Sequence, residues 1–443
     1  MVALSNRRDT SAHLEEKDVG THAGACQWQG NRPTHLAPID RGKDAWLFLA
    51  ACFFMEALVW GFAFTYGVFQ AHYSSLDMFK HSGNIAVIGT CAMGIMYLDL
   101  PIVFALFRRW PKYQRTGCGI GVLMMCLALA LSSFSTNVTH LIVTQGVVYA
   151  LGGSIAYSPC ILLMEDWFDK RKGLAFCVMW AGTGLGGVIL PFVMERLLDR
   201  FGFRVALRAF AVALFVLTAP LVYFVKPRVP ASQRPRSPPM SLHFVFSSTF
   251  ALFEICNIIE ALGFFLPSIY LPSYARSIGA RGSMEALAVI LLNIASVIGC
   301  ISMGAVIDTW DVTTCILLST IGSSLAVFLL WGFSLSLTPL LVFAAAYGLF
   351  AGSYTSTWPG IMRDIVEKKG STDSTMVLAC LSAGRGIGNI VSGPLSEALL
   401  QNTPWQGEAG YGYGSSYGML IVFTGVTGVI GGGSFLARRL RWI

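Results

Sequence analysis

Long apolar runs, separated by short polar segments, dominate the sequence after residue 44. A run of roughly 20 apolar residues is long enough to cross a bilayer as a helix. The first six runs cover 46–70, 84–107, 116–135, 140–163, 173–193 and 205–225. A further six cover 243–270, 285–306, 313–334, 339–362, 374–399 and 417–437. The pattern predicts an all-α membrane protein with twelve transmembrane helices.

The two groups of six runs share sequence features at nearly constant spacing. The fifth and eleventh runs repeat a glycine pattern at an offset of 202 residues: Gly182, Gly184 and Gly186, then Gly384, Gly386 and Gly388. The stretch 149–159 likewise resembles 347–359. Glycines four residues apart lie on one helix face and let a second backbone approach closely. The repeat predicts two pseudo-symmetric six-helix halves, at 45–225 and 243–437, with a transport site between them near the membrane midplane.

The polar segments predict the topology. Residues 1–44 lack an apolar run, so we expect a disordered cytosolic tail and not a signal peptide. A Pro-rich central loop follows at 226–242, and a short basic tail at 438–443. Lys and Arg favour the cytoplasmic side of a membrane protein. If both termini lie in the cytosol, the loops that face the cytosol hold more Lys and Arg than the loops that face outward. We therefore expect both termini in the cytosol and the protein in the plasma membrane.

Composition supports membrane insertion and argues against several functions. Of the 443 residues, 54% are hydrophobic and 12% are charged, whereas a soluble domain carries about 25% charged residues. The net charge of +7 is dispersed over short loops, so we predict no nucleic-acid partner. The 11 cysteines lie mostly in apolar runs and show no metal-binding spacing. No nucleophile motif or phosphate-binding loop is present, so we predict neither an enzyme nor a bound cofactor. The sequence does not indicate an oligomeric state.

The segment order, the central loop and the repeat together resemble the major facilitator superfamily. Within it the chain is similar to the monocarboxylate-porter family, especially its fungal members. The stretches that carry the resemblance are 44–46, 60–61, 167–187, 195–208, 270–275 and 384–394. The resemblance implies secondary active transport by alternating access, often of a small carboxylate together with a proton. The chain also departs from the family, because Ser296 and Cys300 stand where carboxylate transporters carry an Asp–Arg pair on the eighth helix.

Ionisable residues inside the apolar runs are the main candidates for function. Such a group costs about 2.5–3.5 kcal/mol at mid-membrane, so it usually faces a cavity or a partner. Arg385 either binds an anionic substrate through its planar fork or pairs with a carboxylate on a neighbouring helix. Glu56 and Glu254 lie 198 residues apart, close to the offset of the repeat, so we expect them to be related by it across the cavity. Burial favours the neutral form of a carboxyl group, so either is a candidate for proton coupling. For Asp99 and Glu260 we favour a neutral, hydrogen-bonded contact between helices.

Aromatic and amide side chains complete the predicted substrate site. The aromatic candidates are Trp60, Tyr157, Tyr354 and Trp358, for which packing or anchoring at the membrane interface is the favoured alternative. Asn293 and Asn389 either orient polar groups of the substrate or hydrogen-bond between helices.

Three functions remain open. The first is a secondary transporter of a small organic anion or related metabolite, coupled to protons and embedded in the lipid bilayer. The second is an efflux pump for a fungal secondary metabolite or toxin, which the replaced eighth-helix pair favours. The third is a nutrient sensor that binds its ligand without transporting it. No pattern in the sequence indicates which substrate is transported or whether it is imported or exported.

Overall fold

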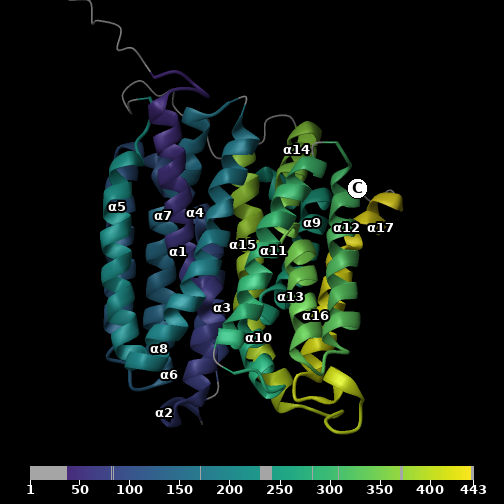
Figure 1. Cartoon of the computed structure of the whole chain (residues 1–443). Coiled ribbons are helices and arrows are strands. Elements are labelled where there is room, and N and C mark those ends of the chain that lie inside the picture. Colours follow the sequence, from purple (N-terminus) through teal and green to yellow (C-terminus); the bar gives the residue numbers. More distant parts are fainter. Residues whose placement is uncertain are drawn as a thin grey trace, which may run out of the picture. The chain divides into compact units, whose positions relative to one another are not determined.

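The computed structural model describes residues 37–80, 82, 84–169, 171–229, 242–281, 283–307, 309–369 and 373–440. Most of the tail expected at 1–44 and of the central loop expected at 226–242 therefore lies outside the described residues, as do the last three residues of the chain. Among the described residues, every regular element is helical (Figure 1). The predicted all-α class is confirmed.

The helices fall into two sets, before and after the central loop (Figure 1). The first set contains α1 (Lys43–Ser75), α2 (Asp77–Lys80), α3 (Ile85–Leu98), α4 (Leu100–Arg109), α5 (Gln114–Ser132), α6 (Val138–Leu141), α7 (Tyr149–Trp167) and α8 (Lys172–Phe224). The second contains α9 (Ser248–Phe264), α10 (Leu266–Ser277), α11 (Ser283–Ile307), α12 (Val312–Leu325), α13 (Leu337–Ala351), α14 (Trp358–Lys369), α15 (Ser374–Gln401), α16 (Gly418–Gly431) and α17 (Gly433–Arg439). Short 3₁₀ and π turns, including η2 (Ile142–Val148), η5 (Ala326–Trp331) and η6 (Tyr354–Thr357), join several neighbours into longer segments.

The membrane-crossing segments agree with the predicted twelve. Within the described residues, 11 helical segments are long and apolar enough to span a bilayer. One of them, Leu174–Phe224, has 51 residues, more than twice the roughly 20 that a crossing needs. It is broken at Gly202, where φ is 72° and ψ is 168°, a backbone conformation that glycine adopts readily. The segment therefore comprises two helices, and the count of crossings becomes twelve.

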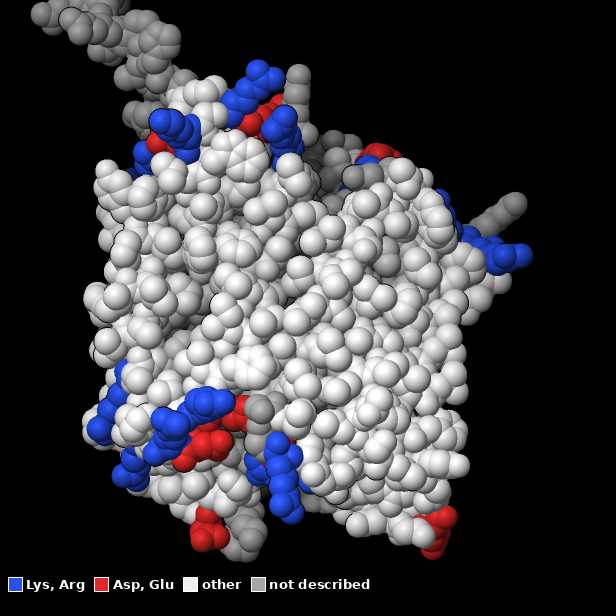
Figure 2. Space-filling view, viewed as in Figure 1, with Lys and Arg blue, Asp and Glu red and all other residues white. Residues whose placement is uncertain are grey.

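The surface between the two ends of the helix bundle is apolar. Figure 2 shows Lys, Arg, Asp and Glu gathered near the two ends of the view, with a broad uncharged band between them. Many large apolar side chains are exposed, among them Ile102 and Val212, which are 72% and 65% exposed. A soluble protein avoids so many exposed apolar side chains, whereas a surface that faces lipid favours them. The helices satisfy their own backbone hydrogen bonds, as a hydrocarbon environment requires.

The glycines of α8 let this helix pack against two neighbours. A Cβ atom at Gly186 would lie 2.2 Å from the carbonyl oxygen of Ala57 on α1. A Cβ atom at Gly184 would lie 1.9 Å from a methyl group of Val297 on α11. One face of α8 thus packs on α1 of its own set, while another face packs on α11 of the second set.

The glycines of α15 act in the same way. A Cβ atom at Gly388 would lie 2.5 Å from the carbonyl oxygen of Ile258 on α9, in the same set of helices. A Cβ atom at Gly386 would lie 2.5 Å from the carbonyl oxygen of Gly94 on α3, in the other set. The two glycine-rich helices therefore both pack across the boundary between the sets, and each does so through the same positions of the repeated pattern.

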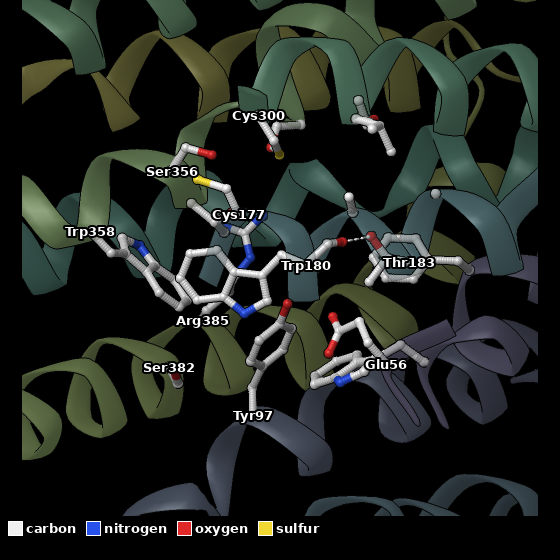
Figure 3. Close-up of a pocket in the computed structure, with 18 of the residues that line it drawn as sticks. Glu56, Tyr97, Cys177, Trp180, Thr183, Cys300, Ser356, Trp358, Ser382 and Arg385 are labelled. Carbon is white, nitrogen blue, oxygen red and sulfur yellow. Dashed lines mark hydrogen bonds between the residues drawn. The ribbon is translucent and has the colours of Figure 1, made fainter. Parts of the chain in front are cut away.

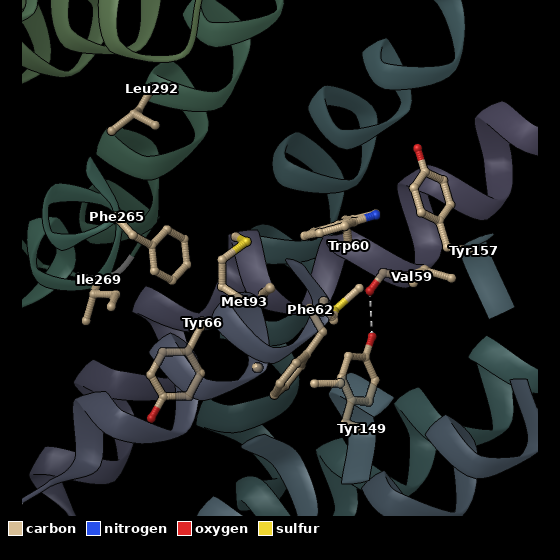
Figure 4. Packing of buried hydrophobic residues seen from close by; sticks show 14 of the residues in the cluster. Val59, Trp60, Phe62, Tyr66, Met93, Tyr149, Tyr157, Phe265, Ile269 and Leu292 are labelled. Atoms are coloured by element: carbon tan, nitrogen blue, oxygen red, sulfur yellow. Dashed lines mark hydrogen bonds between the residues drawn. The ribbon is translucent and has the colours of Figure 1, made fainter. Parts of the chain in front are cut away.

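Buried tyrosines make a second pair of equivalent contacts. The Tyr149 hydroxyl on α7 donates to the Val59 carbonyl on α1 at 2.8 Å (Figure 4). The Tyr347 hydroxyl on α13 donates to the Phe264 carbonyl at the end of α9 at 3.0 Å. Each bond ties one inner helix to the first helix of its own set. The interior around Val59 is filled by aromatic rings, with Phe62 and Tyr149 4.9 Å apart between centroids.

Candidate functional site

A cavity of about 120 Å³ lies between the two sets of helices. Helices α1, α3, α4, α7 and α8 contribute one side, and α9, α11, η6, α14 and α15 contribute the other (Figure 3). Six of the nine side chains proposed from the sequence line it: Glu56, Trp60, Tyr157, Asn293, Trp358 and Arg385. A cavity therefore lies between the two sets, where the sequence predicts the site; that it binds substrate stays a prediction.

Arg385 forms an ion pair through one nitrogen and leaves its other two nitrogens without a partner among the described residues. Its Nη1 atom lies 2.7 Å from Glu260 Oε2 on α9, and the two side chains are 1% and 8% exposed. The centre of the guanidinium lies 4.0 Å from the Phe264 ring centroid and 5.9 Å from that of Tyr354. Nε and Nη2 have no hydrogen-bond partner among the described residues, although buried donors normally have one. The ion pair and the cavity-lining position thus coexist in one side chain.

Glu56 is a buried carboxylate in the cavity wall. It is 3% exposed, and its Oε2 atom has no hydrogen-bond partner in the described part of the chain. The hydroxyl of Tyr157 lies beside it. Gly182 makes room for it, because a Cβ atom there would lie 3.0 Å from the Glu56 Cβ atom. No cationic side chain forms an ion pair with Glu56 within the described residues.

Glu254 occupies a different environment from Glu56, although the two lie 198 residues apart, close to the offset of the repeated stretches. It is half-buried between α9 and α15, and a Cβ atom at Gly384 would lie 1.9 Å from its Oε1 atom. It is not among the residues that line the cavity. Asp99 lies at the break between α3 and α4 and accepts a hydrogen bond of 2.5 Å from the Ser154 hydroxyl on α7. This bond is a contact between helices, of the kind predicted for Asp99 from the sequence.

Aromatic rings form a row along the cavity. Trp60 packs against Tyr97 with centroids 4.6 Å apart and against Tyr157 at 6.0 Å. Tyr97 in turn meets Trp358 of the other set at 6.3 Å in an edge-to-face arrangement. Figure 3 shows Tyr97, Trp358 and Trp180 converging around the space next to Arg385. The row therefore connects the two sets of helices at the level of the charged groups.

Sequence reasoning missed Tyr97 and Trp180, both of which line the cavity. Trp180 lies two residues before Gly182, so its place in the glycine-rich stretch was an available signal. Tyr97 had none, since it is one of many aromatic residues in apolar runs. Tyr354, which was proposed, lies beside the Arg385 guanidinium and outside the residues that line the cavity.

The two asparagines differ in their surroundings. Asn293 lines the cavity and also donates from Nδ2 to the Gly187 carbonyl at 2.9 Å, so it joins α11 to α8. Asn389 is fully buried one turn after Arg385, and neither of its amide atoms has a partner among the described residues. Asn389 is not a cavity-lining residue.

Ser296 and Cys300 both line the cavity, at the positions where the family resemblance implies a charged pair. The Ser296 hydroxyl donates to the Leu292 carbonyl of its own helix at 2.9 Å, and Cys300 donates to the Gly352 carbonyl at 3.0 Å. The side of the cavity formed by α11 is therefore uncharged at these two positions. The cavity's positive charge comes from Arg385 on α15.

Contacts between the two sets occur at both ends of the bundle. At the end where α1 begins, which we call the terminal end, Arg108 on α4 forms an ion pair with Asp373, the N-cap of α15. At the opposite end, Arg276 on α10 donates to the Ala71 carbonyl on α1 at 3.4 Å and binds Glu285 at 2.6 Å. The cavity thus lies between two bridged ends. Among the described residues, no cluster of His, Cys, Asp and Glu is suited to a metal ion.

Comparison with known proteins places this architecture in a family. The family model described as Major Facilitator Superfamily matches residues 112–310 and 253–438, which together cover more than half of the chain. The solved structure of the nucleoside transporter NupG superposes with a TM-score of 0.65, covering 89% of this chain and 99% of that one, at 14% identity. At this identity the likeness concerns the fold alone.

Curated relatives include several fungal transporters. The MFS transporter asaE of Aspergillus flavus is 27% identical over 404 residues, 90% of this chain and 87% of that protein. The agnestins efflux protein AgnL12 of Paecilomyces divaricatus is 27% identical over 448 residues, 98% of each chain. Monocarboxylate transporter 12 of Xenopus laevis is 25% identical over 406 residues, 85% of this chain and 86% of that protein. With the twelve crossings and the central cavity, these matches show that the chain is a membrane transporter belonging to the major facilitator superfamily.

Proposed function

We propose that this transporter exports a small organic metabolite with an anionic or acceptor-rich group, in exchange for protons. One observation carries the proposal. A single cavity holds a buried arginine with unused donors and a buried carboxylate that has no cationic partner among the described residues. The efflux function named for the relative from Paecilomyces divaricatus supports export as the direction.

The two charged groups have different tasks in this proposal. Nε and Nη2 of Arg385 bind an oxygen atom of the substrate, and Glu260 balances the charge of the guanidinium from behind. Glu56 carries the proton, since burial away from a cation favours the neutral form of a carboxyl group. Because both groups line one cavity, substrate and proton are exposed to the same side of the membrane in each state.

Transport requires that the cavity open to one side at a time. We infer that the halves 45–225 and 243–437 rock against each other along the glycine contacts of α8 and α15. The Arg108–Asp373 contact would part when the terminal end opens, and the Arg276–Ala71 contact when the opposite end opens. We further propose that the terminal end faces the cytosol, because that orientation places the denser basic loops inside. We also propose the plasma membrane as its location, since an exporter there would move its substrate out of the cell.

A second candidate is proton-coupled uptake of a small monocarboxylate. The relative named monocarboxylate transporter 12 supports it. The uncharged Ser296 and Cys300 in the cavity wall argue for a different substrate, so we rank this candidate below export.

Flux into proteoliposomes tests the proposal. The purified full chain is reconstituted, either the lumen or the external buffer is made acidic, and uptake of radiolabelled benzoate and lactate is followed against vesicles that are neutral on both sides. We expect an acidic lumen to stimulate benzoate uptake in the wild type. Glu56→Gln should remove the stimulation, whereas the matched control Glu254→Gln, which alters a carboxyl outside the cavity lining, should retain it.

The contrary results are specific. Benzoate flux that ignores the pH gradient would remove the proton from the proposal. Lactate uptake stimulated by external acid would support the monocarboxylate candidate instead. Saturable binding of benzoate without flux of either probe would favour the sensor.

A further inference from the structure

We propose that the substrate is a flat, conjugated molecule that carries several oxygen or nitrogen acceptors and few N–H or O–H donors. The inference rests on the proposed function, because it names the chemical class of substrate for the same cavity. Two independent features of the wall carry it: its aromatic surfaces, and the polar atoms that the protein itself leaves without partners.

The aromatic surfaces come from both sets of helices. Trp60, Tyr97, Trp180, Phe264 and Trp358 all line the cavity. Aromatic rings prefer offset-stacked or edge-to-face neighbours at centroid distances of about 4.5–7 Å. Ring centroids in the row from Trp60 through Tyr97 to Trp358 lie at such distances, 4.6 and 6.3 Å. A flat ring placed beside the row can therefore make stacked or edge-to-face contacts of the same kind. A saturated ring fills similar volume but offers no π-face.

The polar atoms of the wall are unequally divided between donors and acceptors. Four N–H donor atoms in cavity-lining side chains are buried and lack a partner within the described structure: Trp60 Nε1, Trp358 Nε1, Arg385 Nε and Arg385 Nη2. The three residues that hold them are at most 3% exposed. The corresponding acceptor is Oε2 of Glu56, which becomes a donor when the carboxyl group is protonated. The Tyr157 hydroxyl can act either way.

This imbalance selects among ligand classes. A buried donor without a partner is costly, so a ligand that supplies acceptors gains more than one that does not. A conjugated ring with carbonyl, ring-oxygen or carboxylate groups supplies acceptors in the plane of a flat surface. A polyol brings O–H donors for which the wall has few acceptors. A short aliphatic acid engages Arg385 but leaves both indole N–H groups unused.

The test compares three carboxylates of nearly equal outline. Chromone-2-carboxylate is flat and has two further oxygen acceptors, 2-naphthoate is flat without them, and decahydronaphthalene-2-carboxylate is neither. Binding is measured by calorimetry on the purified full chain in lipid nanodiscs. We expect affinity to fall in that order, with about 3- to 10-fold lost at the step that removes the ring acceptors, the factor expected of one hydrogen bond.

Three tryptophan variants isolate the donors. Trp60→Phe and Trp358→Phe keep an aromatic ring and remove the N–H group. Each should therefore lower the affinity for chromone-2-carboxylate by about 3- to 10-fold, the factor of one hydrogen bond, and change the affinity for 2-naphthoate by less than about twofold. Trp331→Phe is the matched control: Trp331 is fully buried with an unpartnered Nε1, but it stacks on Phe343 at 4.9 Å and does not line the cavity. It should leave all three affinities unchanged.

Two results would overturn the inference. The first is equal affinity for the saturated and the flat acids. The second is a Trp331→Phe loss as large as those of the two cavity variants. Either result leaves proton-coupled flux untouched, so it does not refute the proposed function. Conversely, a preference for flat, acceptor-rich ligands in a protein whose flux ignores pH would refute the coupling and keep this inference.

Discussion

Replacing Glu260 by leucine should destabilise the protein more than replacing Arg385 by methionine, although each change removes the same ion pair. The side chains of the pair are 8% and 1% exposed and 2.7 Å apart, so neither group regains water when its partner is lost. A carboxyl group left alone can take up a proton and become neutral. A guanidinium remains charged at any accessible pH.

The magnitudes follow from this difference. A buried charge that loses its partner typically costs about 3–5 kcal/mol, and we expect Glu260→Leu at the upper end of that range. In Arg385→Met the cost is that of protonating Glu260. This cost is about 1.4 kcal/mol for each unit by which the pH of the solution exceeds the pKa of the carboxyl group in the unfolded chain. The folded state then holds a proton that the unfolded state releases, so the stability of Arg385→Met should fall as pH rises. The double variant buries two apolar groups and should lie near the wild type or above it.

Thermal unfolding followed by tryptophan emission in detergent measures these effects at pH 5.5 and pH 8. Wild type, both single variants and the double variant are compared in one series. Flux of labelled benzoate provides the second readout, and it should be absent from the double variant even where that protein is stable, because the donors of Arg385 are gone. Equal losses in the two single variants at both pH values would refute the reasoning. So would a double variant as unstable as Glu260→Leu.

Two further predictions concern packing and the end contacts. Gly186→Ala should cost about 1–3 kcal/mol in the free energy of unfolding, because the new Cβ atom meets the Ala57 carbonyl. Gly119→Ala, whose nearest contact would be 3.9 Å away, is the control and should be neutral or stabilising. Equal shifts of the two melting temperatures would contradict the close-packing account. Asp373→Ala should cost about 1 kcal/mol more than Asp373→Asn, since asparagine keeps the cap on the Thr375 amide while losing the partly exposed ion pair with Arg108. Thermal unfolding of the two Asp373 variants checks this, and an identical loss would mean that the cap contributes nothing.

The spans could be predicted from the sequence because hydrophobic length is a local property. The predicted boundary between 193 and 205 contains Gly202, where the helix breaks. The roles of Gly182 to Gly186 and Gly384 to Gly388 were also accessible, because their spacing puts them on defined helix faces. Glu56 and Trp60, four residues apart, share a face for the same reason, and both line the cavity.

The pairing of Arg385 could not be predicted, because it depends on which helices become neighbours. Several carboxylates lie in apolar runs, and only the packing of α9 beside α15 selects Glu260. Glu254 and Glu260 are six positions apart, or about 240° around the helix, so they cannot face the same partner. The repeat offset relates Glu254 to Glu56 but does not specify how far each helix is rotated toward the cavity. Tyr97 was missed because its role depends on the same long-range packing.

Paired distance measurements test the central claim, which is that two halves alternately open one cavity to the two sides. On a cysteine-depleted background, spin labels at the exposed Trp110 and Glu367 report the terminal end, and labels at the exposed Phe201 and Arg281 report the opposite end. Distances are measured in nanodiscs at pH 5.5 and pH 8, with and without chromone-2-carboxylate. We expect the two distances to change in opposite directions, one lengthening as the other shortens. Distances that stay constant, or that lengthen and shorten together, would contradict the account.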